Sequence, residues 1–482
     1  MKKNLNLNRS LFSTAVFALC SGALMPAFAQ VETKITGRIH YDIRNIDSGS
    51  LNDIADKDTS SIADGFELRR VRIGIQGSIN KDLQYEAVAN SVGSTTNIID
   101  TAFINYGYKT DAQLRVGRFK QPFSLEENTS SNNIDFMERS YVNQLVPAKK
   151  LGAMFHGFTD SGFTYGVSVY QNDFNELTNQ TPNGSMGALR FTSNIAQLAA
   201  WDTENSVFHL GLGYVSGSYE QTTASSTNTS KTAEYKTRGT IVGFRDENRG
   251  LSNAYRLQIG GDVNTSNAYG ALGDNVTTVN QNMKGIELAL ANGPFKVQAE
   301  YASSRFDASA SRCDWSTSGT CTSKGTAVLG ADVEAQYVSL LWNITGEKFA
   351  KTYSKGSWGG IKPNADFMKD YGGVVGNGMG AWQVAYRLSK YSVSVDQASG
   401  TTSGTETAVN DGSTSYNSRY QNSPTATTQT IGLNWFLSSN ARVMFNYSKT
   451  AFGSSVEALD TNSDSSTTKT ENIFSIRTQI NF

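Results

Sequence analysis

The chain of 482 residues has few of the groups on which catalytic and metal sites depend. It contains three cysteines and three histidines, and the histidines are scattered, with no Ser-His-Asp order. Beyond the N-terminal segment, no stretch approaches the roughly 20 apolar residues of a membrane-spanning helix. A formal net charge of −1 does not suit a nucleic-acid-binding protein. The sequence therefore predicts no cofactor, no nucleic-acid partner and no enzymatic activity. An enzyme on a barrel scaffold is a rival hypothesis that would need a histidine and a nucleophile on one strand face near the rim.

What the sequence contains instead is alternation of apolar and polar residues with a period of two. The segment 472–482 shows it most clearly, because side chains of successive residues in a strand point to opposite faces. One face carries Phe474, Ile476, Ile480 and Phe482, and the other carries Ser475, Arg477, Gln479 and Asn481. A final strand that closes in phenylalanine resembles the last strand of bacterial outer-membrane barrels. In those proteins the terminal aromatic residue is part of the signal read by the barrel-insertion machinery, so Phe482 is expected to contact that machinery.

The N-terminal segment has the pattern of a secretory signal. Basic residues (Lys2, Lys3, Arg9) precede an apolar run over 11–25, and Ala27-Phe28-Ala29 has the small-x-small pattern of a cleavage site. The alternative is a transmembrane anchor, but Ser21, Gly22 and Pro26 interrupt the run. We predict a cleavable signal peptide over 1–29 and a barrel domain over 30–482.

The lengths of the links between alternating segments distinguish a transmembrane barrel from a soluble β-sandwich. We count sixteen candidate strands. Short links are expected at 80–82, 110–111, 159–161, 292–294 and 438–440, and long polar links at 46–65, 120–150, 171–185, 219–280, 307–331, 398–424 and 453–470. If both termini are periplasmic, the short links fall on the periplasmic side and the long links on the outside, as in outer-membrane barrels. One lysine-rich link, 346–378, breaks this rule. The predicted fold class is all-β, a transmembrane antiparallel barrel of about 16 strands in the bacterial outer membrane.

Several blocks of sequence resemble one family. They include Leu68–Gly74, Arg115–Glu126, Phe136–Ser140, Gly285–Glu287 and Gly432–Phe436. In this order and spacing they resemble the phosphate-selective porin O/P family over nearly the whole mature chain. The resemblance implies a sixteen-stranded barrel, usually a homotrimer in outer-membrane lipids, that passes small solutes passively. It also implies a preference for anions such as phosphate.

The link 120–150 is expected to fold into the pore. It carries apolar residues that an exposed loop would not need: Phe123, Leu125, Ile134, Phe136, Met137, Leu145 and Val146. Packing on the inner wall would bury them. We therefore predict an inward constriction loop over 120–150.

Arginines on the inward parity are the expected anion contacts, because a guanidinium stays charged and its fork of donors matches phosphate oxygens. Arg70 and Arg72 share the lumen face, and Arg38 lies on the neighbouring first strand. Arg69 has the opposite parity, so it should lie at a strand end or a bulge. With the positions implied by the family, the predicted anion pathway comprises Arg38, Arg69, Arg70, Arg72, Asp100, Arg118, Lys120, Ser130, Ser131 and Arg139. Possible companions are Arg238, Arg245, Arg249 and, beside Arg38, Arg477. The alternative is that these arginines only solvate a water-filled bore.

The sequence departs from the phosphate-specific members of the family beside Thr129-Ser130-Ser131. Those members have lysines on both sides, whereas here Glu127 and Asn128 precede and Asn132 follows. Glu126 and Glu127 would place negative charge at the constriction unless Arg118, Arg139, Lys149 or Lys150 pairs with them. Weak selectivity or a different solute are therefore alternatives to phosphate. A surface adhesin acting through 219–232 and 398–428 is a further alternative.

Two minor patterns concern cross-links and metals. Cys313 and Cys321 are predicted to form a disulfide in an oxidising compartment, with a metal site as the weaker alternative. Asp460, Asn462, Asp464 and Glu471 have most of the spacing of a calcium loop, but Ser465 stands where glycine is needed. A solvated loop is the alternative there, and no metal site is predicted.

Overall fold

The computed structural model describes residues 31–48, 65–92, 98–172, 184–222, 239–251, 254–259, 276–315, 321–367, 378–402, 405–406, 419–459 and 465–482. The signal peptide predicted over 1–29 lies outside these residues and stays a prediction. No helix among the described residues has both the length and the apolar character needed to cross a membrane.

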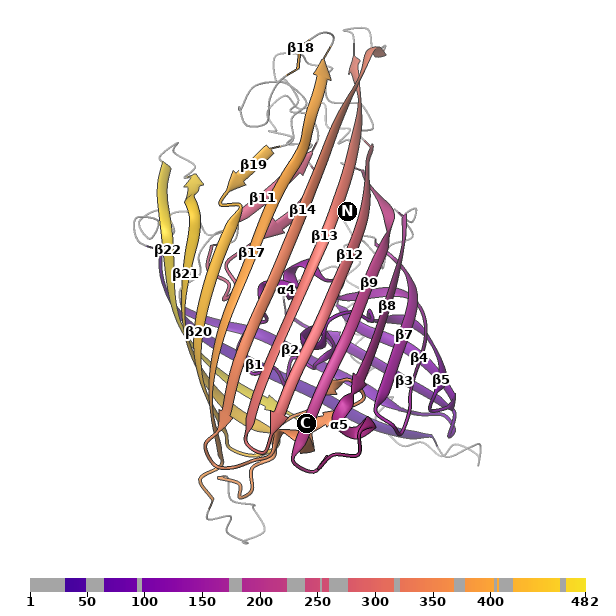
Figure 1. Ribbon diagram of the computed structural model, residues 1–482, viewed down its shortest axis with the longest axis vertical. Coiled ribbons are helices and arrows are strands. Elements are labelled where there is room, and N and C mark those ends of the chain that lie inside the picture. Colours follow the sequence, from indigo (N-terminus) through magenta and orange to yellow (C-terminus); the bar gives the residue numbers. More distant parts are fainter. Residues whose placement is uncertain are drawn as a thin grey trace, which may run out of the picture.

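Sixteen antiparallel strands form the wall of a closed barrel (Figure 1). Each strand pairs with the next in chain order, and β22 pairs with β1 to close the ring. The predicted fold class and strand count are confirmed. The wall strands are β1 (Glu32–Asp47), β2 (Gly65–Ser78), β3 (Leu83–Asn90), β4 (Ile99–Lys109), β5 (Ala112–Lys120), β6 (Lys149–Phe158), β7 (Phe163–Gln171), β8 (Gly184–Asn194), β9 (Ser206–Thr222), β12 (Val276–Asn292), β13 (Phe295–Trp315), β14 (Cys321–Asn343), β17 (Ala381–Thr402), β20 (Thr425–Phe436), β21 (Ala441–Leu459) and β22 (Ser465–Asn481).

The period-two pattern determines which side chains face lipid and which face the lumen. In β22, Phe474 and Ile480 are about half exposed on the outer surface, whereas Arg477 and Gln479 are buried inside the barrel. In β12, Ile286 points outward and Glu287 is buried inside. A wall strand with one apolar and one polar face satisfies the membrane and the lumen at once.

The links sort by length as expected. Five of the links at one end of the barrel contain only two to four residues, and a sixth carries the short helix α5 (Ile195–Leu198). We call this the short-turn end; Figure 1 shows it at the bottom. The seventh link at this end joins β14 to β17 and is long. The opposite, long-loop end carries the other connections, including a three-stranded sheet of β10 (Gly239–Phe244), β11 (Tyr255–Ile259) and β19 (Arg419–Asn422). A two-residue strand, β18 (Thr405–Glu406), pairs with the end of β17.

Four predicted long loops are shorter than the sequence suggested, because the strands continue into them. The expected loop 307–331 is largely strand, since β13 runs to Trp315 and β14 starts at Cys321. Strands likewise enter the predicted loops 219–280, 398–424 and 453–470. The outward side chains of these extensions meet water, whereas inward residues such as Ala308 and Leu329 are buried in one cluster with residues of the β10–β11 sheet. The result is a high wall of β12, β13, β14 and β17 opposite a low wall of β2 to β7 (Figure 1).

The loop 120–150 folds into the lumen, as predicted. It contains two short helices, α3 (Leu125–Asn128) and α4 (Tyr141–Leu145). Its apolar side chains are buried against β9, β12, β13, β14, β17 and the β10–β11 sheet; those that are less than 9% exposed are Phe123, Leu125, Ile134, Phe136, Met137 and Val146. The rings of Tyr141, Phe244 and Tyr391 pack together, which fixes α4 to both the sheet and the wall.

The lysine-rich link that broke the length rule also folds inward, from the short-turn end. It forms the 3-10 helix η2 (Phe349–Thr352) and a tight hairpin of β15 (Tyr353–Ser354) and β16 (Ser357–Trp358). Trp358 is buried, and its backbone N–H donates to Thr129 Oγ1 at 3.3 Å. This link is long because it packs inside the barrel beneath the constriction loop.

The two cysteines lie on the paired outer extensions of β13 and β14. Cys313 lies opposite Lys324, and Cys321 lies opposite Trp315. Their side chains are outside the described part of the structure, so the disulfide stays a prediction.

Candidate ion pathway through the barrel

A cavity of about 1240 Å³ runs through one side of the barrel, beside the constriction loop. It extends from Lys81 and Thr110 near the short-turn end to Arg245 and Glu247 near the long-loop end. Its lining contains thirteen lysines and arginines and five acidic residues. The cations are Arg38, Arg69, Arg70, Arg72, Lys81, Arg115, Arg118, Lys120, Arg139, Lys149, Arg190, Arg245 and Lys355, and the acids are Glu86, Asp100, Glu127, Glu138 and Glu247.

The narrow part of the cavity is built from the inward faces of β1 to β6 and from the constriction loop. Arg72 lies opposite Arg38 in the β1–β2 pairing. The Arg72 guanidinium is 2.8 Å from Asp100 Oδ1, and Lys149 also pairs with Asp100. Arg38 donates to Ser131 Oγ at 2.7 Å, which joins the wall to the loop. These contacts place four predicted pathway residues in one cluster, with Lys149 as a fifth member.

A bulge in β2 turns Arg69 inward. His40 pairs with Arg70 and Tyr41 pairs with Leu68, so Arg69 is the extra residue. Its guanidinium donates to both carboxylate oxygens of Glu138, at 2.7 and 3.0 Å. The expectation that Arg69 lies at a bulge agrees with this geometry.

Glu138 of the constriction loop is the centre of an arginine cluster. Besides Arg69, its carboxylate lies 2.9 Å from Arg477, 3.7 Å from Arg44 and 3.8 Å from Arg70. Burial opposes the ionised form of Glu138, but the surrounding arginines outweigh it and hold its pKa well below the ordinary value. A carboxylate of the chain thus occupies a position among four guanidinium groups where an anion would otherwise be stabilised.

The acidic residues that the sequence placed near the constriction are neutralised within the protein. Glu127 is 3.6 Å from Arg139 and 4.0 Å from Lys120. Burial opposes its ionisation, but Arg139 and Lys120 more than compensate and lower its pKa. Glu126 pairs with Arg387 at 3.3 Å and accepts hydrogen bonds from Ser140. The expected negative charge at the constriction is therefore absent.

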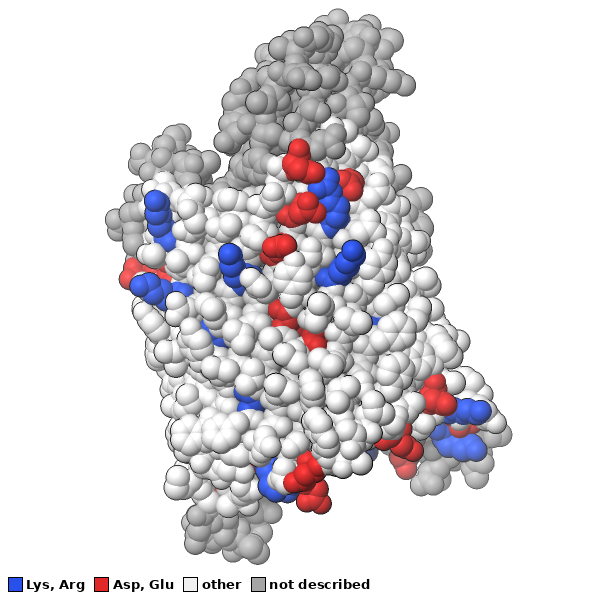
Figure 2. Space-filling view, in the orientation of Figure 1, with Lys and Arg blue, Asp and Glu red and all other residues white. Residues whose placement is uncertain are grey.

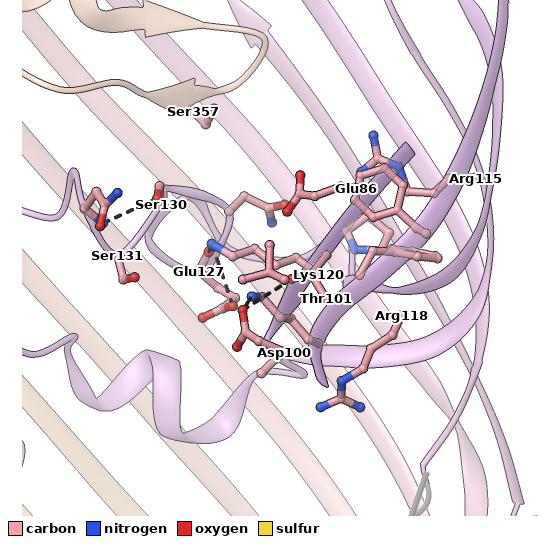
Figure 3. A pocket seen from close by; sticks show the side chains of 18 of the residues that line it. Glu86, Asp100, Thr101, Arg115, Arg118, Lys120, Glu127, Ser130, Ser131 and Ser357 are labelled. Carbon is pink, nitrogen blue, oxygen red and sulfur yellow. Dashed lines mark hydrogen bonds and ion pairs between the residues drawn. The ribbon is translucent and has the colours of Figure 1, made fainter. Parts of the chain in front are cut away.

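Lys120 and Arg139 differ from the other predicted contacts because loop carbonyls hold them. Lys120 donates to the carbonyls of Glu127 and Thr129, and Arg139 donates to those of Glu126 and Thr129. In Figure 3 Lys120 lies beside Glu127 and Asp100 at the centre, whereas Arg118 points away from this group. Ser130 accepts from the backbone N–H of Asn132. These residues shape the loop as much as they line the cavity.

Besides Lys81 near the short-turn end, four cations in the lining have no carboxylate within ion-pair distance among the described residues. Arg38 is bound to a neutral hydroxyl. Arg115 donates to Asn105 and lies 4.3 Å from the centre of the Phe103 ring. Lys355, at the tip of the β15–β16 hairpin, lies 4.1 Å from the centre of the Phe158 ring. Arg245 is the fourth. None of the four forms an ion pair among the described residues, so their donors remain available to ions in the cavity.

Sequence reasoning missed two of these four as site residues. Arg115 was recognised only as part of a family block, although its exposed neighbours Leu114 and Val116 give it inward parity. Lys355 carried no usable signal, because its link was expected in solvent.

The expected companions have mixed outcomes. Arg245 lines the cavity, whereas Arg249 pairs with Glu67 at 3.7 Å, and Arg238 is outside the described residues. Arg477 binds Asp42 and Glu138 rather than joining Arg38, because the β1–β22 register places it opposite Asp42.

Within the described residues, no group of three or more His, Cys, Asp or Glu side chains is placed to hold a metal ion. Glu471, the last residue of the calcium-like spacing, is buried and accepts from the backbone N–H of Leu251 at 3.1 Å. Residues 460–464 are outside the described chain, as are most of the loops named for an adhesin.

Comparisons with known proteins agree with this architecture. Porin O of Pseudomonas aeruginosa is 23% identical over 427 residues, which cover 86% of this chain and 82% of that protein. Among solved structures, outer-membrane expressed OmpT of Vibrio cholerae has a TM-score of 0.47 at 10% identity, covering 95% of this chain and 99% of its own. The DcaP channel of Acinetobacter baumannii has a TM-score of 0.45 at 9% identity, covering 95% and 99%. The family described as phosphate-selective porin O and P matches residues 33–482. The chain therefore belongs to this family and is an outer-membrane β-barrel porin.

Proposed function

We propose that this porin is a passive, anion-selective channel for small oxyanions such as inorganic phosphate, with no catalytic step. The main support for this proposal comes from four side chains that line one cavity and form no ion pair among the described residues: Arg38, Arg115, Arg245 and Lys355. A wall of fixed cations in a confined space raises the local concentration of anions and lowers that of cations. The family name and the name of Porin O support phosphate as the solute class.

The contacts in the narrow part suit stepwise exchange of a hydration shell. Arg72 and Lys149 share Asp100, and Arg38 is held only by a hydroxyl. An oxyanion entering here would accept hydrogen bonds from Arg38 and Arg72 while Asp100 keeps the site from binding it too tightly. A channel needs sites that bind weakly enough to release the ion.

The test is the reversal potential of the reconstituted porin in a planar bilayer under a KCl gradient, followed by addition of phosphate. We expect the sign of an anion-selective pore and a reduction of chloride current at millimolar phosphate. A cation-selective sign would overturn anion selectivity. Unchanged chloride current in phosphate would overturn the preference for oxyanions alone.

Arg70→Ala combined with Arg72→Ala provides a variant test. Both side chains line the cavity, and their loss leaves Asp100 and Glu138 less compensated. We expect selectivity to shift toward cations while the barrel still folds. Unchanged selectivity in this variant would show that these guanidinium groups lie off the ion path.

We further propose that the porin is a homotrimer that associates through the outer face of the low wall. β3, β5 and β7 contain only eight or nine residues, and Phe66 on the adjacent β2 is 74% exposed. Neighbouring subunits would cover this short, apolar part of the barrel. Native mass spectrometry in mild detergent tests the proposal, and monomers alone would contradict it.

A further inference from the structure

The outer face of the high wall, together with β21 two strands beyond β17, carries three lysines that form no ion pair among the described residues. Lys284 on β12, Lys390 on β17 and Lys449 on β21 are exposed on the lipid-facing side. Within the part of the chain that the structure describes, no ion pair involves their ammonium groups. Arg305 on the same wall is different, because it pairs with Asp307, Asp332 and Asp396 at 2.8 to 3.1 Å. We call the three lysines the lysine row.

The strand pairings place the lysine row along one line around the barrel. Lys284 aligns through β13 and β14 with Ser392 of β17, and Lys449 aligns through β20 with Leu388 of β17. On β17, Lys284 therefore aligns with position 392 and Lys449 with position 388, and Lys390 itself lies between these two positions. Strand tilt requires a small stepwise offset of this kind between points at one height. At about 4.8 Å per strand, neighbouring lysines are roughly 10–15 Å apart around the wall.

The row lies at the upper boundary of the apolar band. The indoles of Trp382 and Trp435 stack on the outer surface near the short-turn end. From Trp382 to Lys390 the chain covers nine residues, and a tilted strand crosses the bilayer in about 9–11. Figure 2 shows blue side chains spread across the upper part of this face, with red ones among them, and a mostly white surface below.

Tyrosine hydroxyls mark the same boundary. Each of four outward-facing tyrosines, on alternate strands of this half of the barrel, donates to a polar side chain on the next strand: Tyr214 to Asn282, Tyr301 to Glu334, Tyr386 to Gln429 and Tyr447 to Asn472. Aromatic residues with one polar end collect where a membrane meets water. The lysines therefore face lipid headgroups rather than acyl chains or bulk solvent.

We propose that Lys284, Lys390 and Lys449 bind the phosphate groups of phosphorylated lipids in the outer leaflet, whose acyl chains lie against the apolar band below. An ammonium group is a strong point-charge partner for phosphate. Three cations at headgroup level outnumber the single carboxylate of Glu334 that lies in the same line, so they attract an anionic lipid more than a zwitterionic one. Arg305, whose charge three aspartates already compensate, contributes little to this binding.

The test uses the full, folded porin in neutral detergent, titrated with lipid A bearing two phosphates and followed by native mass spectrometry. The variant is Lys284→Gln/Lys390→Gln/Lys449→Gln. We expect its affinity for lipid A to fall by about tenfold or more, with a smaller loss for lipid A bearing one phosphate and none for phosphatidylcholine. Equal lipid A binding by the variant and the wild type would overturn the proposal.

Two controls separate this effect from general loss of surface charge. Arg305→Gln removes a compensated cation from the same wall, and Lys109→Gln/Lys351→Gln/Lys362→Gln removes three exposed lysines outside the band. We expect both to bind lipid A as the wild type does, and an equal loss in either would contradict a specific row. Each single lysine variant is measured as well, so that poor folding of the triple variant leaves the proposal open to refutation. A partial loss in each single variant supports it, and no loss in any overturns it.

Discussion

The two sides of this barrel share one strand pattern but use their inward side chains differently. On the side formed by β1 to β7, which we call the open arc, arginines such as Arg38, Arg72 and Arg115 line the cavity. On the side formed by β9 to β21, the filled arc, inward polar residues bind the loops inside the barrel. Ser389 and Thr428 hydrogen-bond Tyr141, for example, and Glu300 accepts the backbone N–H groups of Leu125 and Glu126.

The difference shows that a lumen-facing charge is not by itself a pore charge. Arg72 can contact ions that enter the barrel because it lines the cavity. Arg387 has the same parity but is about 1% exposed, and it binds Glu126, Glu247 and the carbonyl of Glu138. We therefore expect selectivity to depend on the open arc and stability of the constriction to depend on the filled arc.

The largest expected effect comes from breaking the filled arc. Arg387→Ala would leave Glu126 and Glu247 buried without their shared cation, and removing one partner of a buried pair costs about 3–5 kcal/mol. We expect a lower urea midpoint for unfolding and a wider, noisier pore with unchanged selectivity sign. Arg305→Ala, on an exposed triple pair, is the control and should cost less than about 1 kcal/mol. Similar midpoints for the two variants would contradict the division into arcs.

The reciprocal experiment alters the open arc. Arg38→Ala with Arg115→Ala removes two cations that have no carboxylate partner among the described residues, so little should be left unpaired. We expect a several-fold fall in the anion-to-cation permeability ratio, measured from the reversal potential, with a change in unfolding free energy of about 1 kcal/mol or less. A large loss of stability would place these arginines among the structural contacts.

A third prediction sharpens the boundary between the arcs, where Glu138 lies. Glu138→Gln removes the carboxylate that occupies the cluster of Arg44, Arg69, Arg70 and Arg477. We expect phosphate to block chloride current at lower concentration than in the wild type, because Arg69 and Arg70 become available to it. Glu67→Gln, which alters pairs at the long-loop end, is the matched control. Unchanged block in Glu138→Gln would show that its arginines are inaccessible to ions.

The smallest expected effect is a pH dependence carried by Glu247, which lies between β10 and β11 and lines the cavity. Burial raises its pKa to about 7, although Arg387 acts in the opposite direction. Below this pKa Glu247 is neutral, so the cavity loses one negative charge as pH falls from 8 to 6. We expect a modest rise in anion selectivity over this range, absent in Glu247→Gln. Because the folded-state pKa is raised, the stability contributed by protonated Glu247 falls as pH rises from the ordinary glutamate range to about 7 and does not change further above that.

Parity predicted much of this structure from the sequence. It predicted the barrel, the strand count and the inward face of Arg38, Arg70 and Arg72, and it limited Arg69 to a strand end or a bulge. The excess of apolar residues in 120–150 also predicted the inward loop. These features share one cause. Each follows from the polarity of neighbouring residues in the chain, which determines the face of the strand or loop that is turned away from water.

Other features could not be predicted because they depend on long-range packing. The link around Lys355 is rich in lysine and looks solvent-exposed, yet Trp358 is buried against the constriction loop. The high wall continues beyond the membrane, where its inward residues pack against the β10–β11 sheet, a contact between segments far apart in the sequence. The charges of Glu126 and Glu127 are compensated by residues that parity alone could not pair with them. Filled and open arcs have the same alternation, so the division between them follows only from where the loops pack.

Arg477 links the constriction loop to the strand pair that closes the barrel, β1 and β22. Its guanidinium, on the last strand, donates to Asp42 on the first strand and to Glu138 on the constriction loop. The seam between β1 and β22 and the constriction loop therefore share one cation. Arg477 makes all of its contacts only when Asp42 and Glu138 are both in place. A barrel with an open seam would lack one of the contacts that hold its constriction loop, beside those that Glu138 makes with Arg69 and Arg70. We therefore expect completion of the ring to tighten the constriction.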